Sequence, residues 1–286
     1  MTNAPTLNKE ELFDKSIKRA LGGGMSGTVA MATQVGTLMW LRTTVNYQYK
    51  HGTGFKETLK ILYNQGGLRR FYRGVGPALL QAPLSRFGDT AANTGIMFYL
   101  NTNETTKNMP LAMKTFCGSL TAGLWRINLM PIDTCKSMLQ VQGNSGMKIL
   151  REKIKQNGLR TLYYGSMGAF GSTLIGHFPW FFTYNYLNKR IPKPSSDETI
   201  HKLGRYAVIG FASSLVSDTV SNSARVVKIS RQTAKEKISY KQVFKRIIEE
   251  DGILGLLGRG LKTKIISNGV QGLLFTVIWK SLEERF

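Results

Sequence analysis

Near the middle of the chain, an acid, a base and an amide follow a proline at helical spacing. Pro131 precedes Asp133, Lys136 and Gln140 in a segment that otherwise has the composition of a long helix. In an α-helix, Asp133 and Lys136 lie one turn apart on the same face, where they can form an ion pair. The proline removes a backbone hydrogen bond, which predicts a kink just before that face. We expect a bent helix that presents three polar side chains at its bend; the alternative is a surface helix with an incidental ion pair.

The composition of the 286-residue chain narrows the classes of function. Its net charge of +22 indicates contact with nucleic acid or with an anionic membrane surface. The basic residues match no nucleic-acid-binding fold and do not alternate with aromatic residues, so we expect no nucleic-acid partner. Two cysteines and three scattered histidines have no zinc-binding spacing, and we predict no metal site. No hydrolase, kinase or dinucleotide motif is present, so we do not expect an enzyme.

Six long stretches of the chain are weakly polar and rich in Gly, Ala, Ser and Thr. Each is long enough to cross a hydrocarbon core, which takes ~20 helical residues, and small residues suit close helix packing in lipid. None is a plain run of apolar residues, so a soluble helical domain is the alternative. The six stretches are Ile17–Asn46, Gly76–Leu100, Leu111–Val141, Ser166–Asn188, Leu203–Ile229 and Leu261–Leu282.

The basic residues gather in every second connection between these stretches. The connections Arg42–Arg73, Lys136–Arg160 and Arg225–Lys264 hold 24 of the 39 Lys and Arg residues. The intervening connections, Asn101–Pro110 and Lys189–Lys202, are short and mixed in charge. This alternation favours six membrane spans whose basic connections face one compartment.

A glycine-rich turn recurs three times at nearly even spacing. Between Gly67, Gly158 and Gly252 the separations are 91 and 94 residues. A short, basic, amphipathic stretch precedes each copy, and one of the six long stretches follows it. The repeated unit is therefore a long helix, a surface helix, a turn and a second long helix. The three copies read QGGLRRFYRG, QNGLRTLYYG and DGILGLLGRG, at 65–74, 156–165 and 251–260.

With these three repeats and the Pro131-x-Asp133-x-x-Lys136 signature, the chain resembles the mitochondrial carrier family over nearly its whole length. The resemblance implies an all-α membrane protein with six transmembrane helices in three pseudo-symmetric repeats and three short matrix-side amphipathic helices. It also implies a multi-pass location in the mitochondrial inner membrane, with the basic connections in the matrix. The expected division is an N-terminal tail at 1–16 and repeats at 17–105, 106–194 and 195–286.

The family closes its matrix side with acid–base pairs between repeats, each braced by a glutamine. Here only the second repeat has the full signature, and the first offers only Arg42. In the third repeat, either Asn222 or Arg225 takes the position of the acid, and Asp218 is the nearest compensating carboxylate. We therefore expect Asp133 to be the only acid of this gate and to pair with Arg42 or Arg225, while Lys136 has no obvious carboxylate. The predicted matrix gate is Pro131, Asp133, Lys136, Gln140, Arg42, Arg225 and Lys228.

The resemblance also places substrate contacts about two turns after each turn glycine. These positions are uncharged, which favours a neutral or zwitterionic solute, and nearby Arg86 is either a further contact or the partner of Asp89. On the other side, Tyr184 and Asn185 are the remnants of the cytoplasmic gate. The expected contacts are Gln81, Ser172, Thr173, Ser267, Asn268 and Arg86.

The helices that follow the turns are expected to begin at anion sites for membrane lipids, because helix N-termini attract anions and the family binds cardiolipin there. No other cofactor is expected. The turn glycines of these lipid sites are Gly67, Gly74, Gly158, Gly165, Gly252 and Gly260.

Two hypotheses of function follow. In the first, the chain transports a small, neutral or zwitterionic solute across the inner membrane by alternating access. In the second, it is a transport-inactive carrier fold that serves as a structural or accessory subunit of an inner-membrane, respiratory-chain complex. The missing acids favour the second hypothesis, whereas the intact second repeat and the polar cavity positions favour the first.

Overall fold

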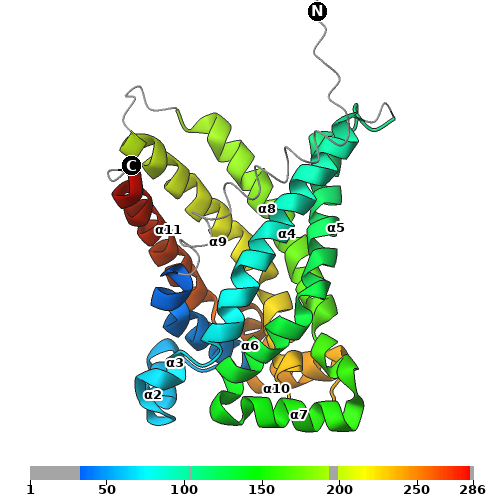
Figure 1. Ribbon diagram of the computed structural model, residues 1–286, viewed down its shortest axis with the longest axis vertical. Helices are drawn as coiled ribbons and strands as arrows, with labels where there is room; N and C mark the ends of the chain where they lie inside the picture. Colours follow the sequence, from blue (N-terminus) through cyan, green and yellow to red (C-terminus); the bar gives the residue numbers. More distant parts are fainter. Residues whose placement is uncertain (1–32, 103–104, 193–198, 284–286) are drawn as a thin grey trace, which may run out of the picture.

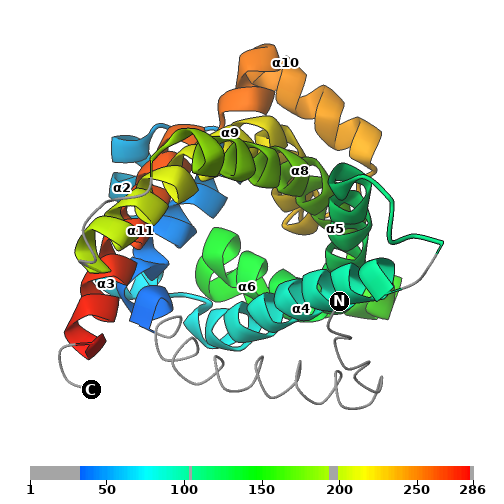
Figure 2. The same cartoon turned by 90° about the horizontal axis from the view of Figure 1, so that it is seen from above.

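Long tilted helices stand around a common centre, and shorter helices lie across one end (Figures 1 and 2). The structure is a computed structural model that describes residues 33–102, 105–192 and 199–283. The first helix covers residues 33–51. The other helices are α2 (Phe55–Asn64), α3 (Gly67–Phe71), α4 (Val75–Thr102), α5 (Leu111–Asn128), α6 (Met130–Gln142), η1 (Gly143–Ser145), α7 (Gly146–Asn157), η2 (Leu159–Tyr163), α8 (Ser166–Arg190), α9 (Thr199–Gln232), α10 (Tyr240–Gly258) and α11 (Leu261–Glu283).

The long helices follow one another around a ring. In turn, α4 packs against α5, α5 against α8, α8 against α9, and α9 against α11. Val35 and Met39 of the first helix pack against Ala78 and Ala82 of α4, which brings the ring back to its start. The view from above shows this ring with α6 inside it (Figure 2), and the side view shows α6 near the end where α2, α7 and α10 lie (Figure 1). We call this the basic end, because it carries the predicted basic connections.

The helices match the six predicted stretches and the three predicted surface helices closely. Of the first stretch, residues 17–32 lie outside the described part of the chain. The expectation of an all-helical chain is confirmed for the described residues. By hydropathy, none of the helices within 33–102, 105–192 and 199–283 is both long enough and apolar enough to cross a membrane.

The predicted kink before Asp133 is present. Helix α5 ends at Asn128 and α6 begins at Met130, with Pro131 in its first turn. A proline in the first turn costs no hydrogen bond, because the N–H groups of that turn have no acceptor within the helix. The corresponding helix of the third repeat, α9, has no proline and runs unbroken for 34 residues. A bend at this level is therefore a feature of the second repeat and not of the third.

The largest buried hydrophobic cluster of the described residues lies at the basic end, where three long helices converge. We call the first helix, α5–α6 and α9 the odd helices. Val45, Val141 and Val226, one from each odd helix, meet in a buried cluster. The surface helix α10 covers this cluster with Val243 and Ile247. The basic end is consequently closed by apolar packing as well as by polar contacts.

Three buried basic side chains connect neighbouring repeats at the basic end. Each donates to carbonyl groups at or just beyond the C-terminal end of an odd helix of another repeat, where backbone carbonyls lack intrahelical partners. Arg70 donates to the carbonyls of Gln140 and Val141, at 2.8 and 2.9 Å. Burial lowers the pKa of the Arg70 guanidinium to about 10.

The other two connections complete the set around the molecule. Lys153 of α7 donates to the carbonyl of Ala234 at 2.8 Å, and its burial lowers its pKa to about 8. Arg259 donates to the carbonyl of Lys50 at 3.3 Å. We call Arg70, Lys153 and Arg259 the three latches; each joins a surface helix or turn to the end of the next odd helix.

The turn glycines have positive φ angles, a conformation that glycine adopts without the strain of a side chain. At Gly74 the φ angle is +87°, and an added Cβ would lie 3.0 Å from the carbonyl oxygen of Lys136. At Gly165 the φ angle is +98°, and an added Cβ would lie 3.3 Å from the carbonyl oxygen of Lys228. These turns thus press directly on the backbone of α6 and α9. All six predicted glycines have positive φ: Gly67, Gly74, Gly158, Gly165, Gly252 and Gly260.

We predict that Gly74→Ala destabilises the protein by roughly 2 kcal/mol, because alanine is strained at positive φ and meets the α6 backbone. Gly76 is the matched control: it is exposed, it lies two residues later in α4, and an added Cβ there meets nothing within 4 Å. Gly76→Ala should leave the stability unchanged or raise it slightly, since alanine favours a helix. The apparent melting temperatures in detergent measure both, and a loss at Gly76 equal to that at Gly74 would contradict the argument.

Candidate functional site

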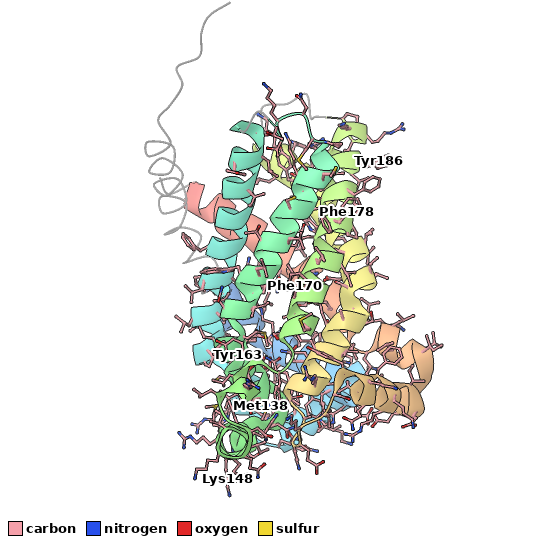
Figure 3. All side chains as sticks on the ribbon, turned by 90° about the vertical axis from the view of Figure 1, so that its right-hand side faces the viewer. Met138, Lys148, Tyr163, Phe170, Phe178 and Tyr186 are labelled. Carbon is pink, nitrogen blue, oxygen red and sulfur yellow. The ribbon has the colours of Figure 1, made fainter. Side chains whose placement is uncertain are left out.

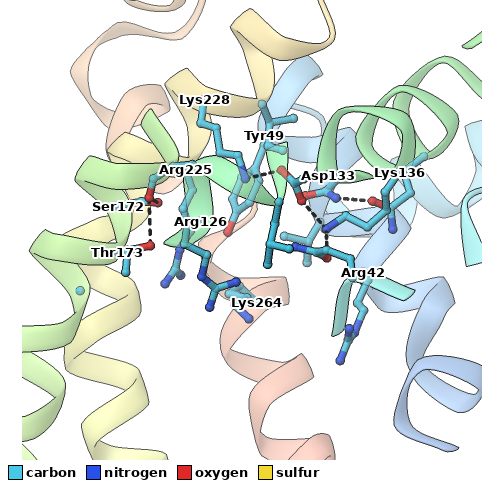
Figure 4. A pocket seen from close by; sticks show the side chains of 18 of the residues that line it. Arg42, Tyr49, Arg126, Asp133, Lys136, Ser172, Thr173, Arg225, Lys228 and Lys264 are labelled. Carbon is cyan, nitrogen blue, oxygen red and sulfur yellow. Dashed lines mark hydrogen bonds and ion pairs between the residues drawn. The ribbon is translucent and has the colours of Figure 1, made fainter. Parts of the chain in front are cut away.

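The carboxylate of Asp133 is held between two lysines from different repeats. Lys136 Nζ lies 2.6 Å from Oδ1, and Lys228 Nζ lies 2.6 Å from Oδ2. The Asp133 side chain is only 5% exposed, so both contacts are formed away from bulk water. Figure 4 shows the carboxylate lying between the two lysine side chains. A single acid therefore joins the second repeat to the third.

Part of the predicted pairing at this gate was wrong. The base that reaches Asp133 from the third repeat is Lys228, and not Arg225; no ion pair joins Asp133 to Arg42. Lys136 does have a carboxylate, which is that of Asp133 in its own helix. We had looked for a partner of Lys136 in the other repeats, but the one-turn spacing of Asp133 and Lys136 already brings their side chains together.

Contacts of the turn glycines show which residues of the three repeats are equivalent. Gly74 faces the carbonyl of Lys136, and Gly165 faces the carbonyl of Lys228. In the same way, Gly260 faces the carbonyl of Val45 in the first helix. Lys136, Lys228 and Val45 therefore occupy the same position in their repeats. Counting back three residues from each gives the acid position.

This register puts arginine where two of the three acids would stand. The acid position holds Asp133 in the second repeat, Arg42 in the first and Arg225 in the third. Of the two registers considered for the third repeat, the one with Lys228 at the base position is confirmed. We call the nine residues at the acid, base and brace positions the gate ring: Arg42, Val45, Tyr49, Asp133, Lys136, Gln140, Arg225, Lys228 and Gln232.

The two arginines of the gate ring differ in their surroundings. Arg225 forms an ion pair with Asp218 of its own helix, and so within the third repeat. Asp218 also accepts a hydrogen bond from Asn268 of α11. Arg42 makes no hydrogen bond or ion pair with any other residue in the described part of the chain. It nevertheless lines the same cavity as the rest of the ring.

Amide side chains brace the ring, as the resemblance implied. Gln232 donates to the hydroxyl of Thr134 at 2.9 Å and to Asp133 Oδ2 at 3.3 Å. Gln140 accepts a hydrogen bond of 2.5 Å from Asn46 of the first helix. A neutral amide contact therefore connects the first repeat to the second, where the family pattern has an acid–base pair.

A cavity of about 470 Å³ lies against the gate ring, and its lining is strongly basic. We call it the lower cavity. Among the described residues that line it, Asp133 is the one carboxylate. Figure 4 shows Arg126 and Lys264 extending to one side of Asp133 and Arg42 to the other. The basic lining residues are Arg42, Arg126, Lys136, Arg225, Lys228 and Lys264.

Most of the predicted substrate contacts line this cavity. Gln81, Ser172, Thr173 and Ser267 are all among its walls, and Gln81 accepts a hydrogen bond of 2.7 Å from Lys136. Asn268 lies in an adjoining cavity and accepts a hydrogen bond of 3.0 Å from Lys264. The side chains of Arg86 and Asp89 lie outside the described part of the structure.

The sequence analysis missed Arg126 and Lys264. Arg126 lies seven residues before Asp133, which is two helical turns, and Lys264 lies three before Ser267. The same helical spacing that linked Asp133 to Lys136 places both on cavity-facing stripes. They were overlooked because contacts were sought only at fixed distances from the turn glycines.

At the opposite end, the predicted remnants of the cytoplasmic gate are Tyr184 and Asn185, and both are uncharged. The ring of Tyr184 stacks on Trp180, one turn earlier in α8, with centroids 5.1 Å apart. Asn185 is exposed. The lipid sites expected at the turn glycines stay a prediction.

We predict that Asp133→Asn destabilises the protein by about 3 kcal/mol, because Lys136 and Lys228 then face each other without a counter-charge. Lys136→Ala should cost about 1 kcal/mol, since Asp133 keeps Lys228 and Gln232. Thermal unfolding in detergent at one scan rate compares the two. Lys245→Ala, which removes an exposed ion pair with Glu249, is the control and should leave the melting temperature unchanged. Equal losses for the Asp133 and Lys136 variants would contradict the central role of the carboxylate.

Comparison with known proteins supports the architecture. Residues 107–195 and 201–286 match the family model described as mitochondrial carrier protein. The calcium-dependent mitochondrial ATP-magnesium/phosphate carrier protein 2 of Arabidopsis thaliana is 24% identical over 96% of this chain, which spans 59% of that relative's length. The mitochondrial carrier protein CoAc1 of Zea mays is 24% identical over 83% of this chain and 77% of its own length.

A third relative is a mitochondrial pyrimidine nucleotide transporter of Saccharomyces cerevisiae, which is 25% identical over 74% of this chain and 64% of its own length. The family model covers more than half of the chain, in the two repeats whose odd helices form the Asp133–Lys228 contact. The chain therefore belongs to the mitochondrial carrier family.

Proposed function

We propose that the protein carries a small anionic solute across the mitochondrial inner membrane by alternating access. Members of the family are transporters and not enzymes. In this proposal the first helix, α4, α5–α6, α8, α9 and α11 are the six membrane spans. The basic end, with α2, α7 and α10, faces the matrix, and the Asp133 contacts hold that side closed.

The charge of the lower cavity is the observation that carries this proposal. Six basic side chains line it; Asp133 pairs with two of them, and Asp218, which lies outside the wall, pairs with Arg225. The bases still outnumber these two acids, and buried charge without enough counter-charge is costly, so such a cavity favours a ligand that brings negative charge. The uncharged contact positions led us to expect a neutral or zwitterionic solute, but they form only part of the wall. Ser172 and Thr173 donate their hydroxyl protons to the carbonyl of Ala169 and carry no charge, so they do not neutralise the anion.

The relatives are consistent with this choice. The Arabidopsis protein is named for ATP-magnesium and phosphate, and the yeast protein for pyrimidine nucleotides. All of these are phosphate compounds. Guanidinium and ammonium groups bind phosphate oxygens through charge-assisted hydrogen bonds, which suits a cavity lined by both.

The gate and the cavity share their lysines, and this supplies a coupling between binding and opening. Lys136 contacts Asp133 on one side and Gln81, a cavity residue, on the other. An anion that takes up Lys136 or Lys228 weakens their hold on Asp133. Because a ligand shifts an equilibrium only by its differential affinity for the two states, the anion must bind the lysines better once they leave Asp133.

The alternative function, as an accessory subunit of an inner-membrane complex, has one observation in its favour. The first repeat contributes no acid–base pair to the gate ring in the described structure, and the arginine at its acid position has no partner there. A carrier fold that no longer alternates would tolerate this loss. Such a protein should co-purify stoichiometrically with a large membrane complex and exchange no solute.

We predict that purified protein in liposomes exchanges phosphate or a phosphorylated compound, and that Lys264→Gln lowers the rate by at least tenfold. The matched control is Lys262→Gln, which removes the same charge from the same helix at an exposed position that does not line the cavity. The control should keep the wild-type rate. A labelled panel of phosphate, dicarboxylates, nucleotides and neutral amino acids measures the selectivity.

Two results would overturn the anion proposal. Exchange of neutral amino acids in preference to every anion would restore the neutral solute. Equal rates for the Lys264 and Lys262 variants would show that the cavity charge has no role in transport.

A further inference from the structure

A second cavity, of about 910 Å³, continues from the lower cavity toward the other end of the molecule. We call it the upper cavity. The two share four wall residues, so a single ligand can occupy both. The shared residues are Gly176, His177, Ser217 and Gln271.

The lining of the upper cavity differs in chemistry from that of the lower one. Trp180 and Phe181 of α8 and Phe211 of α9 contribute aromatic rings. None of its described wall residues is Lys, Arg, Asp or Glu. An apolar, aromatic chamber thus opens directly from a strongly basic one.

The indole ring of Trp180 is fixed in place. It stacks on Tyr184 with ring planes 10° apart, and Phe181 meets it edge-on with centroids 5.0 Å apart. Its N–H points to the hydroxyl of Ser214 on α9 at 3.4 Å. A rigid ring that needs no reorganisation is a favourable surface for stacking a planar group.

An amide lies where the two cavities meet. Gln271 of α11 lines both cavities and makes no hydrogen bond with any other residue in the described ranges. An amide side chain offers two donors and an acceptor, which match the edge of a nitrogen heterocycle or a sugar hydroxyl. The Gln271 amide is therefore available to a ligand that extends from the lower cavity into the upper one.

We infer that the solute is a single molecule with two parts: an anionic, phosphate-type group in the lower cavity and a flat heteroaromatic ring stacked against the α8 aromatic wall at Trp180. This inference rests on the proposed anion transport. It adds the second half of the ligand and its orientation, with the ring directed away from the gate ring. A nucleotide has this chemistry, with Gln271 near the junction of its two parts.

The volumes favour this solute over a bare phosphate ion. The lower cavity alone is within the range of small-ligand sites, about 300–1,000 Å³, and the upper cavity is as well. A bare phosphate would leave the aromatic chamber without a partner. A flexible alkyl phosphate would fill the chamber but gain little from a fixed stack of rings.

Thermal stabilisation of the full-length protein in detergent tests the inference with defined probes. Uridine monophosphate carries ring and phosphate, ribose 5-phosphate carries the same anion without the ring, and octyl phosphate carries an alkyl chain. We expect uridine monophosphate to act at about tenfold lower concentration than either of the others, as stacking of one base on an aromatic ring predicts. Trp180→Leu should abolish that difference and leave the ribose 5-phosphate response unchanged.

Phe182→Leu is the matched control, because Phe182 lies on the same helix with its side chain 64% exposed and outside both cavities. It should respond as wild type. Equal responses to uridine monophosphate and ribose 5-phosphate would overturn the ring site and leave anion binding standing. A stronger response to octyl phosphate would replace the ring by a chain. No response to any of the three would overturn the anion proposal and the ring site together.

Discussion

The carboxylate of Asp133 holds together a ring of residues that would otherwise repel one another. Lys136 and Lys228 reach it from two repeats, each at 2.6 Å, and it is nearly inaccessible to water. Arg42 adds a further positive charge to the same ring, as does Arg225, which has its own ion pair with Asp218. Because charges in a poorly solvated site are weakly screened, the repulsion between Lys136 and Lys228 has to be offset locally, by Asp133. The closed basic end and the charged cavity against it both depend on this contact.

The turns and the helix break could be predicted because glycine and proline specify them, and the effects of these residues on the backbone are local. The six glycines that the repeat places in turns all have positive φ, and the break before α6 lies beside Pro131. The first and third repeats have neither that proline nor an acid, so no local signal fixed their register. It emerged only from contacts across repeats, such as that of Gly74 with the backbone of Lys136. Some basic residues share a helix face with a predicted contact, as Lys264 does with Ser267. Their spacing was visible in the sequence, but they do not lie at the fixed distance from a turn glycine that defined the predicted contacts.

Two arginines at acid positions change what the gate ring can do. With three carboxylates, such a ring would neutralise itself, and the cavity against it would owe its charge to other residues. Here the ring itself makes the cavity basic, and part of the closure falls to contacts that carry no opposed charges. Asn46 meets Gln140, the valines of the odd helices pack beneath α10, and the latches bind helix carbonyls. An anion in the cavity can compete with Asp133 for the lysines, but it does not compete for the amide and apolar contacts, so these can keep the basic end closed.

An anion in the lower cavity therefore acts on the closed state in two opposite ways. It reduces repulsion among Arg42, Arg225 and the lysines, which favours closure, and it draws Lys136 away from Asp133, which favours opening. Only the difference between these terms moves the equilibrium. A solute that is anchored at its other end by the aromatic wall near Trp180 keeps its charge at a fixed height above the ring. That height decides whether the anion reaches Lys136, and so the shape of the uncharged part of the solute can determine whether its charge opens the gate or seals it.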